Sequence, residues 1–138
     1  YSRHARRVVT SGRARIAQLK IPPTPEGMRA FRRKSRWMFN PRDYATLTNW
    51  YDYFALNMYR DLLFHAHEDP FDIPRIRHAL DRLGLTFVGF KLPEAMLDQY
   101  RQRYPDDPAA LNLINWQAFE EAQPDTFSEC YRFLCRHA

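Results

Sequence analysis

Histidine, acidic and cysteine side chains near positions 65 and 130 are the first candidates for chemistry in this chain. His65, His67 and Glu68 are ordinary zinc-ligand types. Residues two apart on a helix lie on different faces, however, so this pattern favours a polar cluster at a helix end. Cys130 and Cys135 lack CxxC spacing, and on one expected strand they would point to opposite faces. We therefore expect neither a metal site nor a disulfide.

Paired carboxylates and glycine-rich loops are the next places to look for catalysis. Asp106–Asp107 and Glu120–Glu121 are adjacent acidic pairs in an expected turn and helix end. Carboxylates there are usually solvated or cap a helix, and seldom act as general acids or bases. Neither GxGxxG nor GxxxxGK occurs. The sequence predicts no catalytic residue and no phosphate-binding loop.

Aromatic side chains are concentrated between Trp37 and Phe54, where seven of eighteen residues are aromatic. One amphipathic helix needs fewer for its buried stripe, and aromatic rings with polar tips suit a binding surface that also touches water. The alternative is that these residues only complete the core. Our hypothesis is a wall that faces a substrate, with these members: Trp50, Tyr51, Tyr53, Tyr59 and His65.

Positive charge is concentrated at the start of the chain. Residues 1–36 hold eleven Lys or Arg and one acidic residue, whereas residues 37–138 hold ten Lys or Arg and fifteen Asp or Glu. We expect residues 1–36 to form a basic helical arm. Its basic contact face would consist of Arg29, Arg32, Arg33, Lys34 and Arg36. Such a face can neutralise phosphates, contact an acidic protein surface or simply be solvated.

The central stretch, residues 59–92, contains the elements that must position these side chains. A helix is expected to end near residues 61–65, and a second helix to begin at Asp72 and end at Gly84. Its apolar stripe is Ile73, Ile76, Leu80 and Leu83. The strand after Gly84, residues 85–92, lacks polar alternation, which predicts cover on both faces, and Gly89 suggests a close backbone approach.

Flanking segments supply further helices and a second strand. We expect Ser2 to cap a helix through Leu19 that breaks near residues 10–12, and Thr24 with Pro25 to start the next helix. The remaining expected elements are a helix from about Asp43, a helix from Pro93, a helix capped by Asp107 or Asn115, and a strand at about 128–136.

These patterns predict an α+β fold that is mainly helical, with a small antiparallel strand pair at about 85–92 and 128–136. A length of 138 residues is that of one domain, so we expect one core. Its predicted members are Leu63, Phe64, Leu80, Leu83, Phe87, Phe90 and Phe133. No run of about 18 apolar residues occurs, and unpaired cysteines fit a cytoplasmic protein.

Several short motifs are shared with a known group of enzymes. They are Tyr1-Ser2, Arg6-Arg7, residues 23–26 with Arg29, residues 60–65, residues 83–85 with Phe87, Gly89-Phe90, Tyr100-Arg101, Pro105, Trp116, Phe119-Glu120, residues 124–127, Tyr131 and Phe133. Together they resemble the C-terminal region of bacterial class I S-adenosylmethionine-dependent methyltransferases, in the group often joined to tetratricopeptide repeats or carrying a regulatory domain.

This resemblance implies that residues 1–138 are one accessory domain, a C-terminal fragment of a larger methyltransferase. Tyr1-Ser2 would directly follow a core strand of the N-terminal catalytic domain. That catalytic domain would be the partner of this chain. The glycine-rich loop and the acidic residue that hold S-adenosylmethionine would lie upstream, so no cofactor is expected here. The domain would recognise substrate or regulate activity. The alternatives are a nucleic-acid-binding module that uses residues 1–36 and a structural interaction domain.

Overall fold

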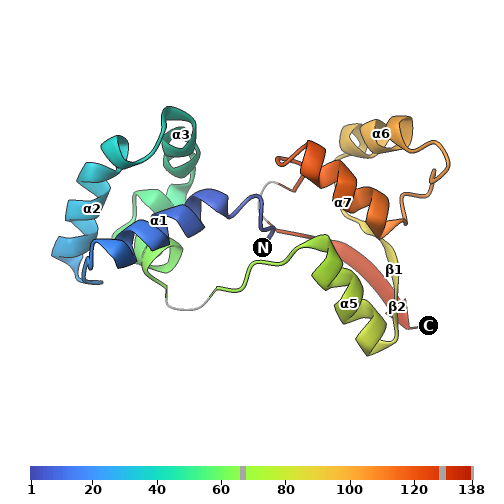
Figure 1. The fold of residues 1–138 in the computed structure, drawn as a ribbon, viewed down its shortest axis with the longest axis horizontal. Coiled ribbons are helices and arrows are strands. Elements are labelled where there is room, and N and C mark those ends of the chain that lie inside the picture. Colours follow the sequence, from blue (N-terminus) through green and yellow to red (C-terminus); the bar gives the residue numbers. More distant parts are fainter. Residues whose placement is uncertain (66–67, 128–129, 138) are drawn as a thin grey trace. The chain divides into compact units, whose positions relative to one another are not determined.

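The structure, a computed structural model, describes residues 1–65, 68–127 and 130–137. It confirms a mainly helical α+β fold with one antiparallel strand pair (Figure 1). The chain forms two compact units. Unit 1 consists of Tyr1–Arg6 and Asp69–Ala138, and unit 2 consists of Arg7–Glu68. Unit 2 is therefore an insertion between the first six residues and the rest of unit 1.

Unit 2 is built from helices. They are α1 (Arg7–Gln18), α2 (Pro25–Met38), α3 (Pro41–Asn49), the 3₁₀ turn η1 (Tyr51–Tyr53), α4 (Leu56–Tyr59) and the π-helical turn η2 (Arg60–Phe64). Thr24 caps α2 by accepting a hydrogen bond from the N–H of Gly27, as predicted. Asn40 caps α3 by accepting from the N–H of Asp43, so α3 begins two residues before the predicted start.

Helix α1 is continuous where the sequence predicted a break. Gly12 is buried in its middle, and a Cβ at this position would lie 2.9 Å from Cδ2 of Leu63 and 3.3 Å from Cζ of Phe39. The glycine therefore allows close packing, and the prediction that it interrupts the helix was wrong. Ser2 does not cap α1, because α1 begins at Arg7 and the Ser2 hydroxyl accepts from the N–H of Ala5, at 3.4 Å, in the turn before it.

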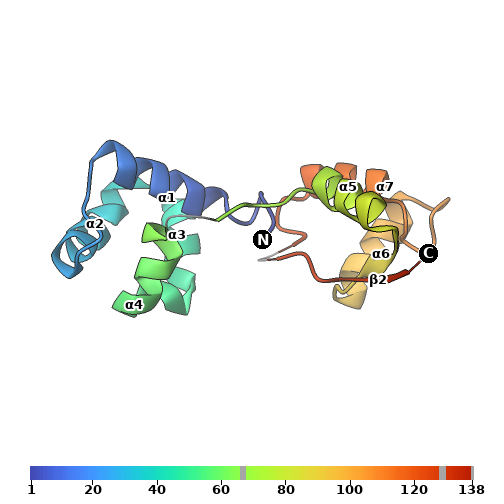
Figure 2. The ribbon, with the colours of Figure 1, turned by 90° about the horizontal axis from the view of Figure 1, so that it is seen from below.

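Unit 1 combines three helices with the strand pair (Figures 1 and 2). The elements are α5 (Ile73–Leu83), β1 (Leu85–Phe90), α6 (Glu94–Arg103), α7 (Leu113–Ala122) and β2 (Phe133–His137). Asp72 caps α5 by accepting from the N–H of Arg75, and Gly84 ends it with φ +62°. Both ends of this helix confirm the prediction, since glycine readily adopts positive φ.

The N-cap of α7 corrects a prediction. Asn112, and neither Asp107 nor Asn115, caps the helix by accepting from the N–H groups of Ile114 and Asn115. Asp107 instead accepts from the N–H groups of Leu111 and Asn112, and from the Tyr100 hydroxyl at 2.5 Å. It orders the loop before α7.

The two strands pair antiparallel, with Phe90 opposite Phe133 and Leu85 opposite His137. A bulge between Phe87 and Gly89 shifts the register. Gly89 has φ +148°, and no atom lies within 4 Å of the place that a Cβ would occupy. The glycine serves this backbone conformation, so the predicted close approach was wrong. Residues 128 and 129, the start of the predicted second strand, lie outside the described part of the chain.

Burial along β1 alternates, which contradicts the predicted cover on both faces. Leu85 and Phe87 are half-buried, whereas Thr86 and Val88 are exposed. The continuous apolar sequence therefore leaves one face of the sheet accessible.

Buried side chains form two clusters, so the prediction of one shared core was wrong. Leu63 belongs to the cluster of unit 2, against which Phe64 packs. Leu80 and Phe90 belong to the cluster of unit 1, against which Phe87 and Phe133 pack. Leu83 belongs to neither cluster and is 67% exposed, because it lies at the last turn of α5, where the predicted stripe leaves the core.

Candidate functional site

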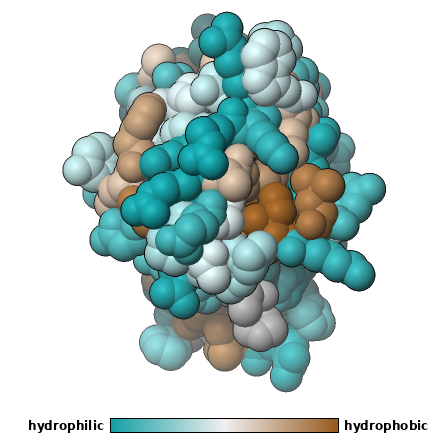
Figure 3. Space-filling view, turned by 90° about the vertical axis from the view of Figure 1, so that its left-hand side faces the viewer, coloured by the Kyte–Doolittle hydropathy of each residue, from teal (hydrophilic) through white to brown (hydrophobic). Residues whose placement is uncertain are grey.

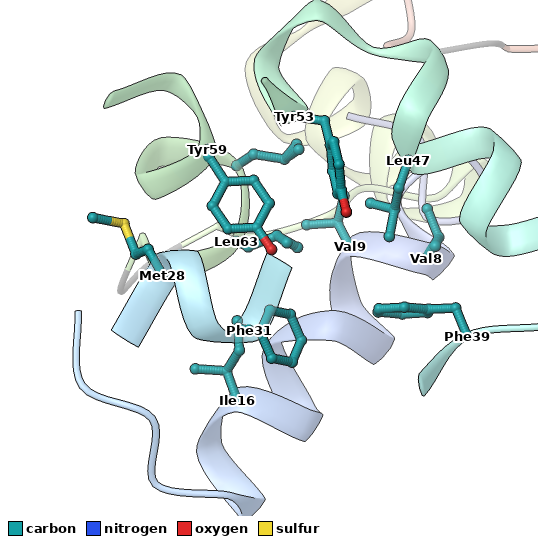
Figure 4. Close-up of a cluster of buried hydrophobic side chains, with 11 residues drawn as sticks. Val8, Val9, Ile16, Met28, Phe31, Phe39, Leu47, Tyr53, Tyr59 and Leu63 are labelled. Carbon is teal, nitrogen blue, oxygen red and sulfur yellow. The ribbon is translucent and has the colours of Figure 1, made fainter. Parts of the chain in front are cut away.

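Tyr53 and Tyr59, two members of the predicted substrate wall, are buried in the core of unit 2 (Figure 4). Their ring centroids lie 5.3 Å apart in an edge-to-face arrangement, which is favourable for aromatic pairs. A wall that contacts substrate needs accessible side chains. The structure therefore assigns these two tyrosines to the core.

The hydroxyl of Tyr53 belongs to a short hydrogen-bonded chain. It lies 2.5 Å from Oγ of Ser35, and Ser35 donates to the carbonyl oxygen of Arg32 at 2.7 Å. The Tyr53 hydroxyl also lies 3.3 Å from the carbonyl oxygen of Arg32, so either hydroxyl can be the donor between Tyr53 and Ser35. Burial raises the pKa of Tyr53 although the Ser35 hydrogen bond opposes this shift, so the phenol stays neutral near pH 7.

The hydroxyl of Tyr59 differs from that of Tyr53. It is buried and has no hydrogen-bond partner among the described residues. Burial, reinforced by the neighbouring Tyr53, raises the pKa of Tyr59 above its ordinary value. The Arg32 guanidinium carbon lies 5.7 Å from its ring centroid. We infer a packing role for the ring.

The other three wall candidates do not form one surface with these tyrosines. Tyr51 is 75% exposed, Trp50 is half-buried and packs against the unit 2 cluster, and His65 is exposed after η2. A role in substrate contact stays a prediction for Trp50, Tyr51 and His65.

The predicted basic contact face is present on α2, with one exception. Arg29, Arg33, Lys34 and Arg36 are exposed. Arg32 is partly buried instead, and its Nη1 donates to the carbonyl oxygens of Phe54 at 2.8 Å and Tyr53 at 3.3 Å. Figure 3 looks onto the side of the molecule where α2 lies in Figure 1, and hydrophilic side chains (teal) are spread over this face around a smaller hydrophobic patch (brown).

An exposed tryptophan borders the basic face. Trp37 is 84% exposed, and the guanidinium carbon of Arg36 lies 5.8 Å from its ring centroid. Trp37 thus places an exposed aromatic ring next to a cation of the basic contact face.

Other cations of residues 1–36 hold the fold together. Arg13 of α1 donates to the carbonyl oxygen of Leu62 at 2.8 Å and to Oε2 of Glu68 at 2.7 Å. It thereby satisfies a carbonyl at the π-helical turn, where the ordinary α-helical pattern is broken. Arg7 donates to Asp43 at 2.8 Å. The positive segment is thus divided between scaffold contacts and the α2 face.

The metal hypothesis gains no support from the described part of the chain. Glu68 binds Arg13, and His67 lies outside the described residues. Within residues 1–65, 68–127 and 130–137, no group of three His, Cys, Asp or Glu is arranged to hold a metal ion. Cys130 precedes β2 and Cys135 lies in it, and both are free thiols.

A buried polar cluster that the sequence did not predict lies in unit 1. Glu120 is 3% exposed, and its Oε1 accepts from Oγ of Ser2 at 2.7 Å. The Tyr131 hydroxyl donates to both carboxylate oxygens, at 2.9 and 2.8 Å. Burial raises the pKa of Tyr131, which keeps it a donor. Ser2 and Tyr131 are 118 and 11 positions from Glu120 in sequence, so no local pattern indicates that the three side chains meet.

The same region clamps the two ends of the insertion together. Ser2 forms a parallel bridge with Phe71, in which the N–H of Arg3 donates to the Phe71 carbonyl and the N–H of Phe71 to the Tyr1 carbonyl, each at 2.9 Å. An ion pair at 3.7 Å joins Arg3 to Asp72. The chain therefore leaves and re-enters unit 1 at neighbouring positions.

An apolar cleft of ≈ 260 Å³ opens between α5, β2 and the first residue of the chain. Its lining includes Tyr1, Ala79, Leu83, Tyr131, Phe133 and Cys135. This cleft explains how Leu83 can be exposed and still border an apolar surface.

No described helix is both long enough and apolar enough to cross a membrane. Comparison of the chain with family models, with curated proteins and with solved structures found no match.

Proposed function

We propose that this chain is the accessory C-terminal part of a bacterial class I S-adenosylmethionine-dependent methyltransferase, in the cytoplasm. The catalytic domain of that enzyme, with its bound S-adenosylmethionine, is the proposed partner. In this proposal unit 1 attaches to the catalytic domain, and unit 2 contributes to substrate recognition or regulation.

The observation that carries the proposal is the meeting of separate motifs in unit 1. Ser2, Glu120 and Tyr131 come from three of the motifs that carry the resemblance, and they join in one buried hydrogen-bonded cluster. Trp116 and Phe119, which belong to the same motif as Glu120, are fully buried in the same unit. The motifs thus have a common physical basis in one fold, which supports a shared ancestry over chance resemblance.

Cofactor binding tests the proposal directly. The parent protein, with its natural sequence upstream of Tyr1, should bind S-adenosylmethionine with micromolar affinity in calorimetry, and the 138-residue chain should not. No binding by the parent, or micromolar binding by the 138 residues alone, would overturn the proposed division of labour.

A deletion tests the role of unit 2. Residues 7–68 can be replaced by a short Gly/Ser linker, because Ser2 and Phe71 already lie side by side in a parallel bridge. The shortened parent should keep its cofactor affinity and lose methyl transfer to its acceptor. Unchanged kcat/KM would exclude unit 2 from substrate recognition.

The exposed cations of α2 with Trp37 favour a second candidate function, the binding of single-stranded nucleic acid. Cations neutralise phosphates and an exposed indole can stack on bases. Binding of a fluorescent oligonucleotide should then weaken steeply with added salt and be lost in R33E/K34E. A matched double variant in unit 1, R132E/R136E, should keep it. Equal loss in both variants would indicate a non-specific charge effect.

A structural interaction domain without a ligand is the third possibility. It predicts that variants of α2, of His65 and of the cleft leave cofactor affinity and turnover of the parent unchanged.

A further inference from the structure

Helix α5 borders a groove of ≈ 590 Å³, which we call the α5 groove. Its lining includes Phe71, Arg75, His78, Ala79, Arg82 and Leu83. Clefts that bind small molecules have volumes of roughly 300–1,000 Å³. The α5 groove is therefore of a size that suits a small ligand.

The α5 groove adjoins the apolar cleft of unit 1. Phe71, Ala79 and Leu83 line both hollows, so the two meet along α5. The apolar cleft continues over Leu85 and Phe133. A polar groove that leads into an apolar cleft is complementary to a ligand with one polar and one apolar end.

Two of the charged groups in the α5 groove already have partners. Both Nη atoms of Arg75 donate to the two carboxylate oxygens of Asp69, each at 2.7 Å. Asp72 caps α5 by accepting from the N–H of Arg75, and its other oxygen lies 3.7 Å from Arg3. These contacts offset the negative charge of the groove within unit 1 itself.

His78 and Arg82 supply the remaining polar side chains of the lining. They are four residues apart, so they are neighbours on the surface of α5, and both are exposed. Neither forms an ion pair with another residue of the described ranges. A guanidinium donates two parallel hydrogen bonds to a carboxylate, and an imidazole adds a further donor. An anionic head group is therefore complementary to this pair.

We propose that the α5 groove and the apolar cleft together bind a small carboxylic acid with an apolar chain. Arg82 and His78 hold the carboxylate by hydrogen bonds. The chain lies against Phe71, Ala79 and Leu83 and extends into the cleft, where it covers Leu83, which is otherwise 67% exposed. All of these residues belong to unit 1, so the site does not depend on the proposed function.

Calorimetry with matched ligands tests the site on the 138-residue chain. Octanoate and octylamine have the same apolar chain and opposite charges near neutral pH. Octanoate should bind at least about tenfold more tightly, because hydrogen bonds between charged partners are the stronger ones. From butanoate to octanoate, each added CH₂ should strengthen binding by up to about fourfold. Equal affinities for octanoate and octylamine, or no dependence on chain length, would overturn the proposal.

Substitution of Arg82 tests the head-group contact. Arg82→Gln should weaken octanoate binding by about tenfold and should not weaken binding of octylamine. The matched control Arg33→Gln removes one exposed cation of unit 2 and should leave octanoate affinity unchanged. Both positions are exposed, so both variants should fold normally. An equal loss in the two variants would reduce the effect to overall charge and refute the site.

Cys135 lines the apolar cleft and reports whether the ligand chain enters it. In a Cys130→Ser background Cys135 is the only thiol. Octanoate at about ten times its dissociation constant should slow alkylation of Cys135 by iodoacetamide, by up to about tenfold. Leu83→Glu places a carboxylate at an exposed position of the cleft wall and should abolish this protection. Binding of octanoate that leaves Cys135 fully reactive would exclude the cleft as the site.

Discussion

Tyr53 and Tyr59 offer a matched pair of substitutions, because each change to Phe removes one buried hydroxyl and keeps the ring. Tyr53→Phe removes the hydroxyl that is hydrogen-bonded to Ser35, so the free energy of unfolding should fall by about 0.5–1.5 kcal/mol. Tyr59→Phe removes a buried hydroxyl that has no partner among the described residues. The free energy of unfolding should therefore stay unchanged or rise by about 1 kcal/mol, since a desolvation penalty is relieved.

Urea unfolding followed by tryptophan fluorescence measures both changes, since Trp37 and Trp50 lie in unit 2. Hydrogen exchange of α1 and α4 amides supplies a local readout that does not require the two units to unfold together. A loss of more than about 0.5 kcal/mol in Tyr59→Phe would show that its hydroxyl is paired in solution and refute the reasoning.

Alkaline pH adds a second measurement on the same pair. Burial raises the pKa of both phenols above the ordinary 10.0. As pH rises, the phenols lose their protons in the unfolded state first. The contribution of the two neutral phenols to the free energy of unfolding is therefore fully present below pH 10 and is lost as pH rises through the folded pKa. Each Phe variant should lose less stability than the native chain between pH 9 and 11, approximately.

The other predictions concern unit 1. Leu80→Ala should lower the free energy of unfolding by about 2–5 kcal/mol, because the side chain is buried. Leu83→Ala should cost less than about 1 kcal/mol, because Leu83 is mainly exposed, and equal losses in urea titrations would contradict this assignment. Glu120→Ala should lower the free energy of unfolding by about 2–3 kcal/mol and expose the first residues to proteolysis, because the buried hydroxyls of Ser2 and Tyr131 lose their acceptor. Glu120→Gln should lower it less. A larger loss in Glu120→Gln than in Glu120→Ala would argue against the cluster. Burial alone would raise the pKa of Asp107, but hydrogen bonds from a tyrosine hydroxyl and two backbone N–H groups outweigh it and lower the pKa. The contribution of ionised Asp107 to the free energy of unfolding is therefore present above the unfolded pKa and lost as pH falls through the folded pKa. The midpoint temperature of thermal unfolding should then depend less on acid pH in Asp107→Asn than in the native chain.

Local sequence signals placed the start of α2 and both ends of α5 correctly. Thr24 with Pro25, Asp72 and Gly84 act through hydrogen bonds or dihedral angles within a few residues. Such interactions depend on neighbours in sequence, so they can be read without knowledge of the tertiary fold. The antiparallel pairing of the two Phe-rich segments was also predicted from their composition, and the structure confirms it.

Positions where a residue contacts distant parts of the chain were predicted wrongly. Gly12 suggested a helix break by its low helix propensity, but its packing against Leu63 and Phe39 decides its role. Leu83 continued the apolar stripe of α5, yet the stripe extends beyond the elements that cover it.

The basic contact face could be predicted from composition, whereas the burial of the proposed substrate wall could not. Composition identified the cationic residues of α2, and all but Arg32 are exposed. Composition could not tell a binding wall from a core, because aromatic residues suit both, and burial assigned Tyr53 and Tyr59 to the core.

The sequence by itself determined the fold class, the start of α2, both ends of α5 and the uneven charge, because these follow from local backbone chemistry and from composition. Only the tertiary structure decided that the chain folds as two units and that Ser2, Glu120 and Tyr131 meet. Contacts between residues more than a hundred positions apart depend on how helices and strands pack, and no local pattern encodes that packing. The same holds for the apolar cleft of unit 1, which exists only once α5 and the strand pair are brought together.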